Sequence, residues 1–296
     1  MHTKGFINPL CCIYYLIMKT LYNYINKYLY RARICTDAHI HLFDHQQNIF
    51  DKYEPKSIFK KFVGFIGVDF NNVDKYSTKD IVSYYDNFIS NAQNYNTILL
   101  AGGIDANAII QTYESHKDII KGFGELLCYD KYDDIELPFK NIDWIETVFA
   151  HNTNNLPVFI HYSLTSDEHY DVIDKLISKY SNTPIVLCHC GLPNIHEGNY
   201  KKEYDTIFNR FLKLQLKHQN LYTDVCDSAF AYLRKNPNEL FKLDLSRTMI
   251  GTDITPNHFE GSADEVSKRL RKSLSKFKKW YRYIDNEAVI KRLFNI

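Results

Sequence analysis

The sequence predicts an α/β protein whose eight parallel strands close into a (β/α)8 TIM barrel. Two observations indicate this fold class. Short apolar or β-branched runs alternate with amphipathic helical stretches from residue 34 onward, and no low-complexity linker divides them. Eight strands, each followed by a helix or a loop, are typical of a parallel barrel in one domain. An open doubly wound sheet is the alternative, but it usually has fewer strands and a glycine-rich phosphate turn, which is missing after the first strand.

Residues 1–33 are expected to form a helical extension ahead of a barrel domain that spans residues 34–296. Leu16, Ile17, Leu21 and Tyr24 recur at helical spacing. The apolar run at 10–18 is nine residues long, too short to cross a bilayer. We therefore expect an amphipathic helix across the main domain and no membrane partner. The run also lacks the basic leader and small-residue cleavage site of a signal peptide.

The expected barrel elements follow in chain order. Each strand is a short apolar or β-branched run, and the eight runs are residues 34–41, 62–69, 97–103, 119–127, 157–162, 184–190, 220–226 and 247–253. Helical periodicity predicts helices over residues 78–95, 105–116, 142–152, 166–180 and 204–217, and 286–294 resembles a closing helix. Asp105 and Ser166 stand where helix N-caps are expected. Substrate-selecting loops are expected at 70–77, 129–138, 192–202 and 255–262.

Composition argues against a nucleic acid or an anionic membrane as the principal partner. The formal net charge is +1, so the chain has no strong overall field. Its seven cysteines are an odd number scattered over a long chain, which favours free buried thiols and a cytoplasmic location. If residues 184–190 are a strand, Cys188 and Cys190 share one face and His189 points to the other. That pattern argues against all three as ligands of one metal ion.

Metal-binding side chains stand at the ends of five predicted strands. His39 and His41 are two residues apart at the end of the first strand, so both imidazoles lie on one face. In a parallel barrel, functional residues gather at the carboxyl ends of the strands. The fourth, fifth, sixth and eighth strands add Glu125, His161, His189 and Asp253. Each alone is explained as a core histidine, a solvated charge or a helix cap, but together they predict a metal site.

These motifs resemble those of the amidohydrolase superfamily of metal-dependent barrel hydrolases. The resemblance rests on the run 37–41, His161, His189 and the run 251–253. It implies His39, His41, His161 and Asp253 as metal ligands, with His189 binding a second ion or polarising the substrate. Gly124-Glu125 resembles the TatD-like branch, in which the glutamate bridges two ions. The run 188–191 is closer to the amidohydrolase-related branch, in which one ion suffices. The resemblance therefore implies a divalent metal, with zinc expected, bound as one ion or as two.

The resemblance implies a metal-dependent hydrolase that cleaves an amide, ester, lactone or phosphoester bond in a small molecule. Asp253 would accept a proton from the attacking water and return it to the leaving group, and His189 would stabilise the developing oxyanion. A TatD-like deoxyribonuclease is one alternative, to which the basic stretch 268–279 would contribute. A non-oxidative decarboxylase and a non-catalytic binding protein are the others. The sequence indicates neither the substrate nor the oligomeric state.

Overall fold

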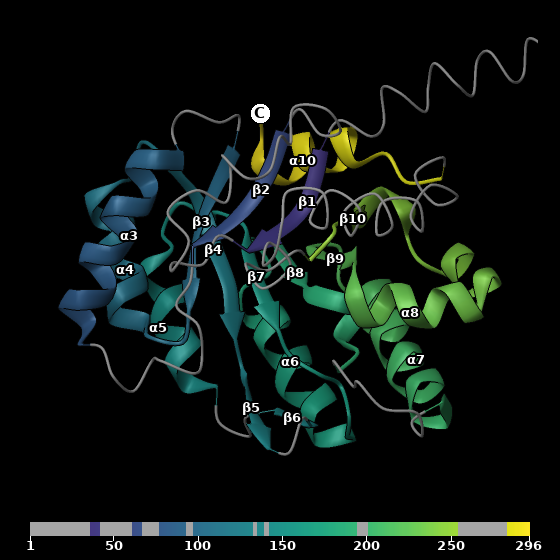
Figure 1. Ribbon diagram of the computed structural model, residues 1–296. Helices are drawn as coiled ribbons and strands as arrows, with labels where there is room; N and C mark the ends of the chain where they lie inside the picture. The colour runs from purple at the N-terminus through teal and green to yellow at the C-terminus, as the bar shows by residue number, and fades with distance from the viewer. Residues whose placement is uncertain are drawn as a thin grey trace, which may run out of the picture.

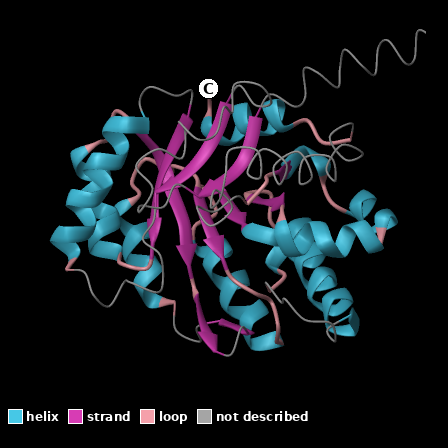
Figure 2. Ribbon diagram, in the orientation of Figure 1, coloured by secondary structure: helices cyan, strands magenta, loops and turns pink. Residues whose placement is uncertain are grey.

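The computed structural model describes residues 36–41, 61–66, 77–92, 97–132, 135–138, 142–193, 201–253 and 283–296. Within these ranges one sheet contains eight strands in the order β1-β2-β3-β4-β7-β8-β9-β10. All seven pairings between neighbouring strands in this order are parallel. Helices surround the strands, as Figures 1 and 2 show. The predicted (β/α)8 barrel is confirmed. The predicted extension at 1–33 and the basic stretch at 268–279 lie outside the described residues.

Each predicted strand overlaps an observed one. The barrel strands are β1 Thr36–His41, β2 Lys61–Ile66, β3 Thr97–Gly103, β4 Ile120–Leu127, β7 Val158–His161, β8 Ile185–Leu187, β9 Leu221–Val225 and β10 Thr248–Ile250. Nearly all of their residues are buried, as expected for a parallel sheet covered on both faces. The predicted strands at 184–190 and 247–253 extend too far, because β8 and β10 are only three residues long.

The predicted helices are also present. They are α3 Thr78–Ala92, α4 Ala106–Ser115, α5 Asp143–His151, α6 Asp167–Lys179, α7 Lys201–Lys217 and α10 Asn286–Phe294. The two predicted N-caps are confirmed. The Asp105 carboxylate accepts the backbone N–H groups of Asn107 and Ala108, and the Ser166 hydroxyl accepts that of His169. No helix in the described part of the chain is long and apolar enough to span a membrane.

Several short elements were not predicted. Strand β8 is followed by the 3-10 turn η3, Cys188–Gly191. Strand β9 is followed by helix α8, Asp227–Lys235, and then by the 3-10 turns η4, Pro237–Lys242, and η5, Leu245–Arg247, which lead into β10. The expected loop at 129–138 contains an antiparallel hairpin made of β5, Tyr129–Tyr132, and β6, Ile135–Pro138. In Figure 1 this hairpin extends below the barrel, beyond the carboxyl end of β4.

The core has two layers, one inside the barrel and one between the strands and the helices. Successive residues along a strand point to opposite faces, so on β3 Ile98 and Leu100 pack inside while Leu99 and Ala101 pack against the outer helices. Helix α10 covers the amino-terminal ends of the strands (Figure 1). Its apolar face supplies Val289, Ile290 and Leu293 to the inner layer. The interior at this end is therefore filled by side chains.

Strands β1 and β10 meet at a seam that closes the barrel. The fully buried Asn286 side chain accepts the Ile250 N–H (2.8 Å) and donates to the carbonyl oxygens of Ile250 (2.6 Å) and Thr36 (3.0 Å). One residue after β10, a Cβ on Gly251 would lie 2.3 Å from the Cβ of His39, so only glycine fits there. Further on, the Asp253 N–H donates to the His39 carbonyl at 2.9 Å. The seam thus places residues after β10 directly beside β1.

Candidate metal centre

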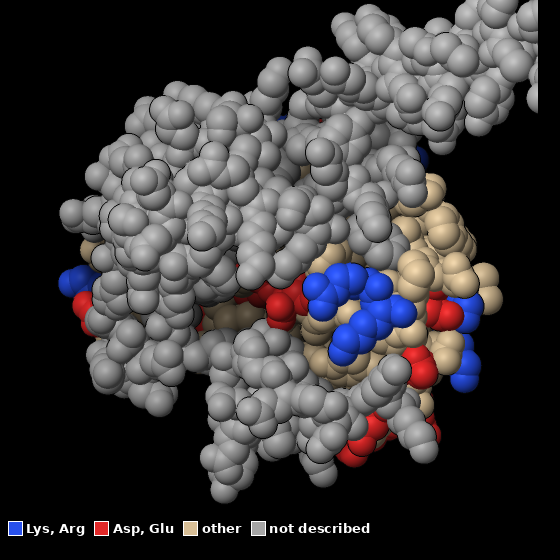
Figure 3. Space-filling view, turned by 45° about the vertical axis from the view of Figure 1, so that its right-hand side comes forward, with Lys and Arg blue, Asp and Glu red and all other residues tan. Residues whose placement is uncertain are grey.

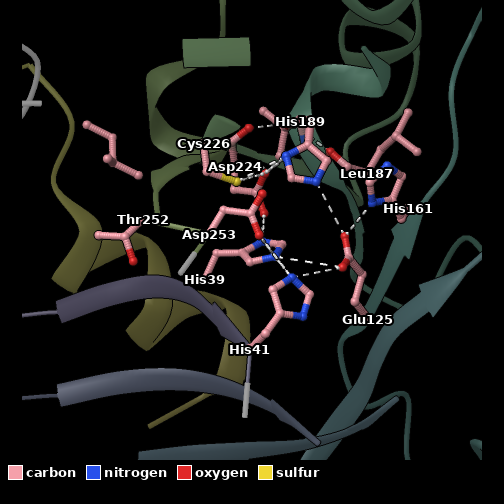
Figure 4. Close-up of polar contacts among 12 residues, drawn as sticks. His39, His41, Glu125, His161, Leu187, His189, Asp224, Cys226, Thr252 and Asp253 are labelled. Atoms are coloured by element: carbon pink, nitrogen blue, oxygen red, sulfur yellow. Dashed lines mark hydrogen bonds and ion pairs between the residues drawn. The ribbon is translucent and has the colours of Figure 1, made fainter. Parts of the chain in front are cut away.

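The six predicted site residues lie together at the carboxyl end of the barrel, as Figure 4 shows. His39 and His41 are on β1, Glu125 is on β4 and His161 ends β7. The other two lie beyond their strands: His189 is in η3 after β8, and Asp253 is three residues after β10. Five of the side chains are buried, and that of Asp253 is the most exposed at 13%. Asp253 is therefore the member that an entering molecule reaches most easily.

One group of ligand atoms has the dimensions of a tetrahedral metal site. The Nε2 atoms of His39 and His41 are 3.1 Å apart, and Asp253 Oδ1 lies 3.4 Å and 2.9 Å from them. Glu125 Oε2 lies 3.8 Å and 3.4 Å from the same two nitrogens. A tetrahedral zinc ion with bonds of about 2.0–2.1 Å separates its ligand atoms by about 3.3–3.4 Å. These residues therefore fit a divalent ion in both spacing and donor chemistry.

A second group shares Glu125. Its other oxygen, Oε1, lies 3.0 Å from His161 Nδ1 and 3.5 Å from His189 Nε2. All three residues are buried, and their ligand atoms lie within 4.8 Å of one another. One carboxylate thus has an oxygen facing each pair of imidazoles. This arrangement can hold two ions bridged by Glu125.

Lys121, the other charged residue of β4, does not approach these groups. Its side chain is exposed, and its Nζ donates to the Asp118 carbonyl. A lysine at that point on β4 lies on the outer face, away from the ligand atoms.

Asp224 on β9 is a site residue that the sequence analysis missed. Its fully buried carboxylate accepts His39 Nδ1–H at 2.7 Å through Oδ2, and the backbone N–H of His189 at 2.7 Å through Oδ1. The Cys226 thiol also donates to Oδ1, with a separation of 3.2 Å. The signal available in the sequence was a charged residue inside an apolar strand, because such a residue is almost never buried without partners.

The backbone around His189 forms a left-handed turn. His189, Cys190 and Gly191 all have positive φ, at 55°, 56° and 64°. For residues other than glycine this conformation costs about 1–2 kcal/mol each. Two side chains of β9 hold the turn in place: Asp224 accepts the His189 N–H, and the Thr223 hydroxyl accepts the Cys190 N–H at 3.1 Å. The expectation that residues 188–190 alternate along a strand is therefore wrong, because the strand ends at Leu187.

Asp37 positions the segment that carries Asp253. Its buried carboxylate accepts the N–H of Thr252 at 2.9 Å and the hydroxyl of Thr252 at 2.6 Å. Burial raises the pKa of Asp37 to about 6, although these hydrogen bonds oppose the rise. The next residue, Asp253, also has a positive φ of 52°. Asp37 thus fixes the chain where it turns Asp253 toward the two histidines of β1.

The two carboxylates among the expected ligands favour their ionised forms. Burial raises the pKa of Glu125, but the nearby His161 and His39 outweigh it and hold that pKa well below its usual range. Burial likewise raises the pKa of Asp253, yet His39 and a hydrogen bond from His41 lower it overall. Both groups therefore concentrate negative charge in a buried site, where it requires protons or metal ions for compensation.

The neighbouring imidazoles show the complementary effect. Burial lowers the pKa of His39, but Asp224 and Glu125 raise it above its ordinary value. For His189, burial is outweighed by a hydrogen bond with Glu125 and by the charge of Asp253, so its pKa is raised well above the ordinary value. The site therefore attracts cations. Protons and metal ions compete for the same nitrogen atoms.

Comparisons with known proteins support the fold. No protein-family model and no curated protein matches the chain. Among solved structures, a probable 2-pyrone-4,6-dicarboxylic acid hydrolase from Acinetobacter baumannii aligns with a TM-score of 0.56 at 16% identity, covering 89% of this chain and 100% of that one. An amidohydrolase from Burkholderia multivorans with bound zinc gives 0.53 at 11%, covering 89% and 99%. A TatD homologue from Escherichia coli gives 0.52 at 17%, covering 90% and 99%.

These similarities concern the fold. With identities of 11–17%, they support the predicted barrel fold. They also span both branches suggested by the sequence, since an amidohydrolase and a TatD homologue align about equally well.

Proposed function

We propose that this protein is a metal-dependent hydrolase that cleaves an amide, ester, lactone or phosphoester bond in a small molecule. The observation that carries the proposal is the convergence of four imidazoles and two carboxylates, from five separate strand ends, on one buried site. Structurally similar proteins include a probable hydrolase of a pyrone dicarboxylic acid and an amidohydrolase. Their chemistry supports hydrolysis here.

The ligand set suits two divalent ions, and Glu125 would offer one oxygen to each. His39, His41 and Asp253 would hold one ion, and His161 and His189 the other. Zinc suits this set of nitrogen and oxygen ligands and is bound in the structure from Burkholderia multivorans. When bound, such an ion lowers the pKa of its water ligand to about 7 and polarises the bond to be cleaved.

The chain's own groups supply the proton transfers. The lowered pKa of Asp253 keeps its carboxylate ionised, so it can accept a proton from the attacking water. Asp253 then returns this proton to the leaving group. Its partial exposure places it where substrate and water arrive. His189 remains assigned to the developing oxyanion or to the second ion, and its buried ring faces Glu125.

Metal analysis and two variants test this function. We expect the purified protein to contain up to two divalent ions per chain by inductively coupled plasma mass spectrometry. It should hydrolyse at least one member of a panel of lactones, esters, amides and phosphoesters. Asp253→Asn should lower kcat by about 10²–10⁴-fold, and His39→Ala should lower metal content as well. A wild type that binds no divalent ion, or full activity in both variants, would contradict the proposal.

A TatD-like nuclease is the second candidate, and one observation favours it. Glu125 has an oxygen facing each imidazole pair, as expected for the bridging glutamate of that branch. Figure 3 shows Lys and Arg side chains gathered beside acidic ones at a hollow on one face, a surface that an anionic substrate could contact. Cleavage of single-stranded DNA that disappears in Asp253→Asn would support the nuclease. Binding of DNA without strong salt dependence would count against it.

A further inference from the structure

We infer that Asp224 and Cys226 form a hydrogen-bonded relay that fixes the ring tautomers of His39 and His189, so that each ring presents a bare Nε2 to the metal centre. The inference rests on the proposed function for the presence of ions. It assigns positioning roles to Asp224 on β9 and to Cys226, the residue directly after β9. Neither residue belongs to the six predicted metal-site residues.

The first half of the relay follows from the chemistry of a carboxylate. The Asp224 carboxylate accepts the His189 backbone N–H at 2.7 Å through Oδ1, and a carboxylate, which is ordinarily ionised at neutral pH, can only accept hydrogen bonds. Its Oδ2 lies 2.7 Å from His39 Nδ1. The ring proton must therefore be on Nδ1. A neutral His39 ring then has its lone pair on Nε2, the atom that faces His41, Glu125 and Asp253.

The second half reaches His189 through a thiol. His189 Nδ1 is 4.0 Å from Asp224 Oδ1, too far for a direct hydrogen bond. Cys226 Sγ bridges the gap, 3.1 Å from His189 Nδ1 and 3.2 Å from Asp224 Oδ1. Both the thiol and the carboxylate are fully buried. In the described part of the chain no other side chain lies within hydrogen-bond distance of this ring nitrogen, so the thiol determines which nitrogen of His189 carries the proton.

The direction of the relay follows from the strength of its acceptors. The thiol proton can go to the ionised Asp224 or to the neutral ring of His189, and a charged acceptor forms the stronger hydrogen bond. With the thiol proton on the carboxylate side, the sulfur accepts the Nδ1–H of His189. Nε2 of His189 is then bare and faces Glu125 Oε1 at 3.5 Å. Two lone pairs facing each other at this distance require a cation between them.

The reverse arrangement predicts a different role for His189. If the thiol donates to Nδ1, the ring proton is on Nε2 and donates to Glu125. His189 would then be a hydrogen-bond donor and could not bind an ion through Nε2. The tautomer of this single ring therefore distinguishes the two directions.

Nuclear magnetic resonance of the zinc-loaded protein measures the tautomers directly. We expect long-range ¹H–¹⁵N spectra of ¹⁵N-histidine-labelled protein to show protonated Nδ1 and metal-bound Nε2 in both His39 and His189. Assignments come from the corresponding His→Gln variants. A protonated Nε2 in His189 of the loaded wild type would overturn the relay. Failure of the wild type to bind zinc would overturn both the relay and the proposed function.

Zinc affinity, measured against a chromophoric chelator, tests the energetic role of the thiol. Cys226→Ala removes the acceptor for His189 Nδ1–H, and we expect the affinity for the more weakly bound ion to fall by about 10–100-fold. Cys226→Ser retains a group that both donates and accepts, so the affinity should return to within about threefold of wild type. Asp224→Asn should weaken both ions, because its Oδ2 position also holds His39.

Cys128→Ala is the matched control. Cys128 is also fully buried, and its thiol donates to the Leu126 carbonyl rather than contacting a ring nitrogen. We expect its zinc affinity to match that of the wild type. If Cys226→Ala and Cys128→Ala bind both ions equally well while the wild type binds two, the relay is wrong and the proposed metal site stands.

Discussion

Replacing Asn286 by alanine removes the side chain that joins β1 to β10. The change leaves three backbone groups without partners: the N–H and carbonyl of Ile250 and the carbonyl of Thr36. All of them lie where Asn286 is fully buried, so water does not replace the lost contacts without rearrangement. Each unpaired buried group costs about 1–3 kcal/mol. Allowing for partial relaxation, we expect the free energy of unfolding to fall by about 3–5 kcal/mol.

Urea unfolding followed by circular dichroism and by intrinsic fluorescence measures this change, and coincidence of the two curves verifies a two-state transition. With a slope of about 3 kcal/mol per molar urea, the midpoint should fall by roughly 1–2 M. Asn238→Ala, at an exposed position on η4, is the control and should change stability by no more than about 0.5 kcal/mol. A loss below about 1 kcal/mol for Asn286→Ala would show that the seam does not depend on this side chain.

Three further predictions concern the site and the surface. Gly251→Ala places a Cβ 2.3 Å from that of His39, so it should cost about 1–3 kcal/mol of stability. The same variant should bind zinc more weakly in a chelator titration, and an unchanged affinity would refute the packing argument. His161→Ala should reduce the zinc content from two ions to one per chain by mass spectrometry, whereas loss of both ions or of none would contradict separate sites. Burial raises the pKa of Asp174, but hydrogen bonds, the first of them from Lys217, lower it overall. The ionised carboxylate therefore stabilises the folded state above the unfolded pKa, and this stabilisation is lost as the pH falls through the folded pKa. Asp174→Asn should therefore cost about 1 kcal/mol in urea unfolding at pH 7 and progressively less as the pH falls below the unfolded pKa, and a cost that does not change with pH would exclude the charge as its cause.

The barrel could be predicted from the sequence because its signals are local. Apolar runs and helical periodicity mark the elements, and the rule that functional side chains stand at the carboxyl ends of barrel strands needs no three-dimensional information. The structure brings together all six residues selected in this way. Glu125 shows the limit of such reasoning, since the sequence identified the residue but not that its two oxygens face different imidazole pairs.

The features that were missed depend on contacts between distant parts of the chain. Asp224 lies 185 residues from His39, and its role arises from that contact rather than from any spacing motif. The left-handed turn at His189 is held by hydrogen bonds from the neighbouring strand, so an apolar run ending in Cys-His-Cys looks like a longer strand than it is. Strand β9 ends at Val225 and helix α8 begins at Asp227, so no turn signal separates the two elements in the sequence.

The seam between β1 and β10 also constrains the order of events during synthesis. His39 and His41 are among the first residues of the barrel to be made, yet Asn286, which ties β1 to β10, is 250 residues later than Thr36 in the chain. Until the ribosome has released Asn286, β1 and β10 remain two open sheet edges that can pair with other chains. The first imidazoles of the site to be translated are thus among the last to be fixed in place. A nascent chain that stops before helix α10 exposes metal-binding side chains and unpaired strands at the same time.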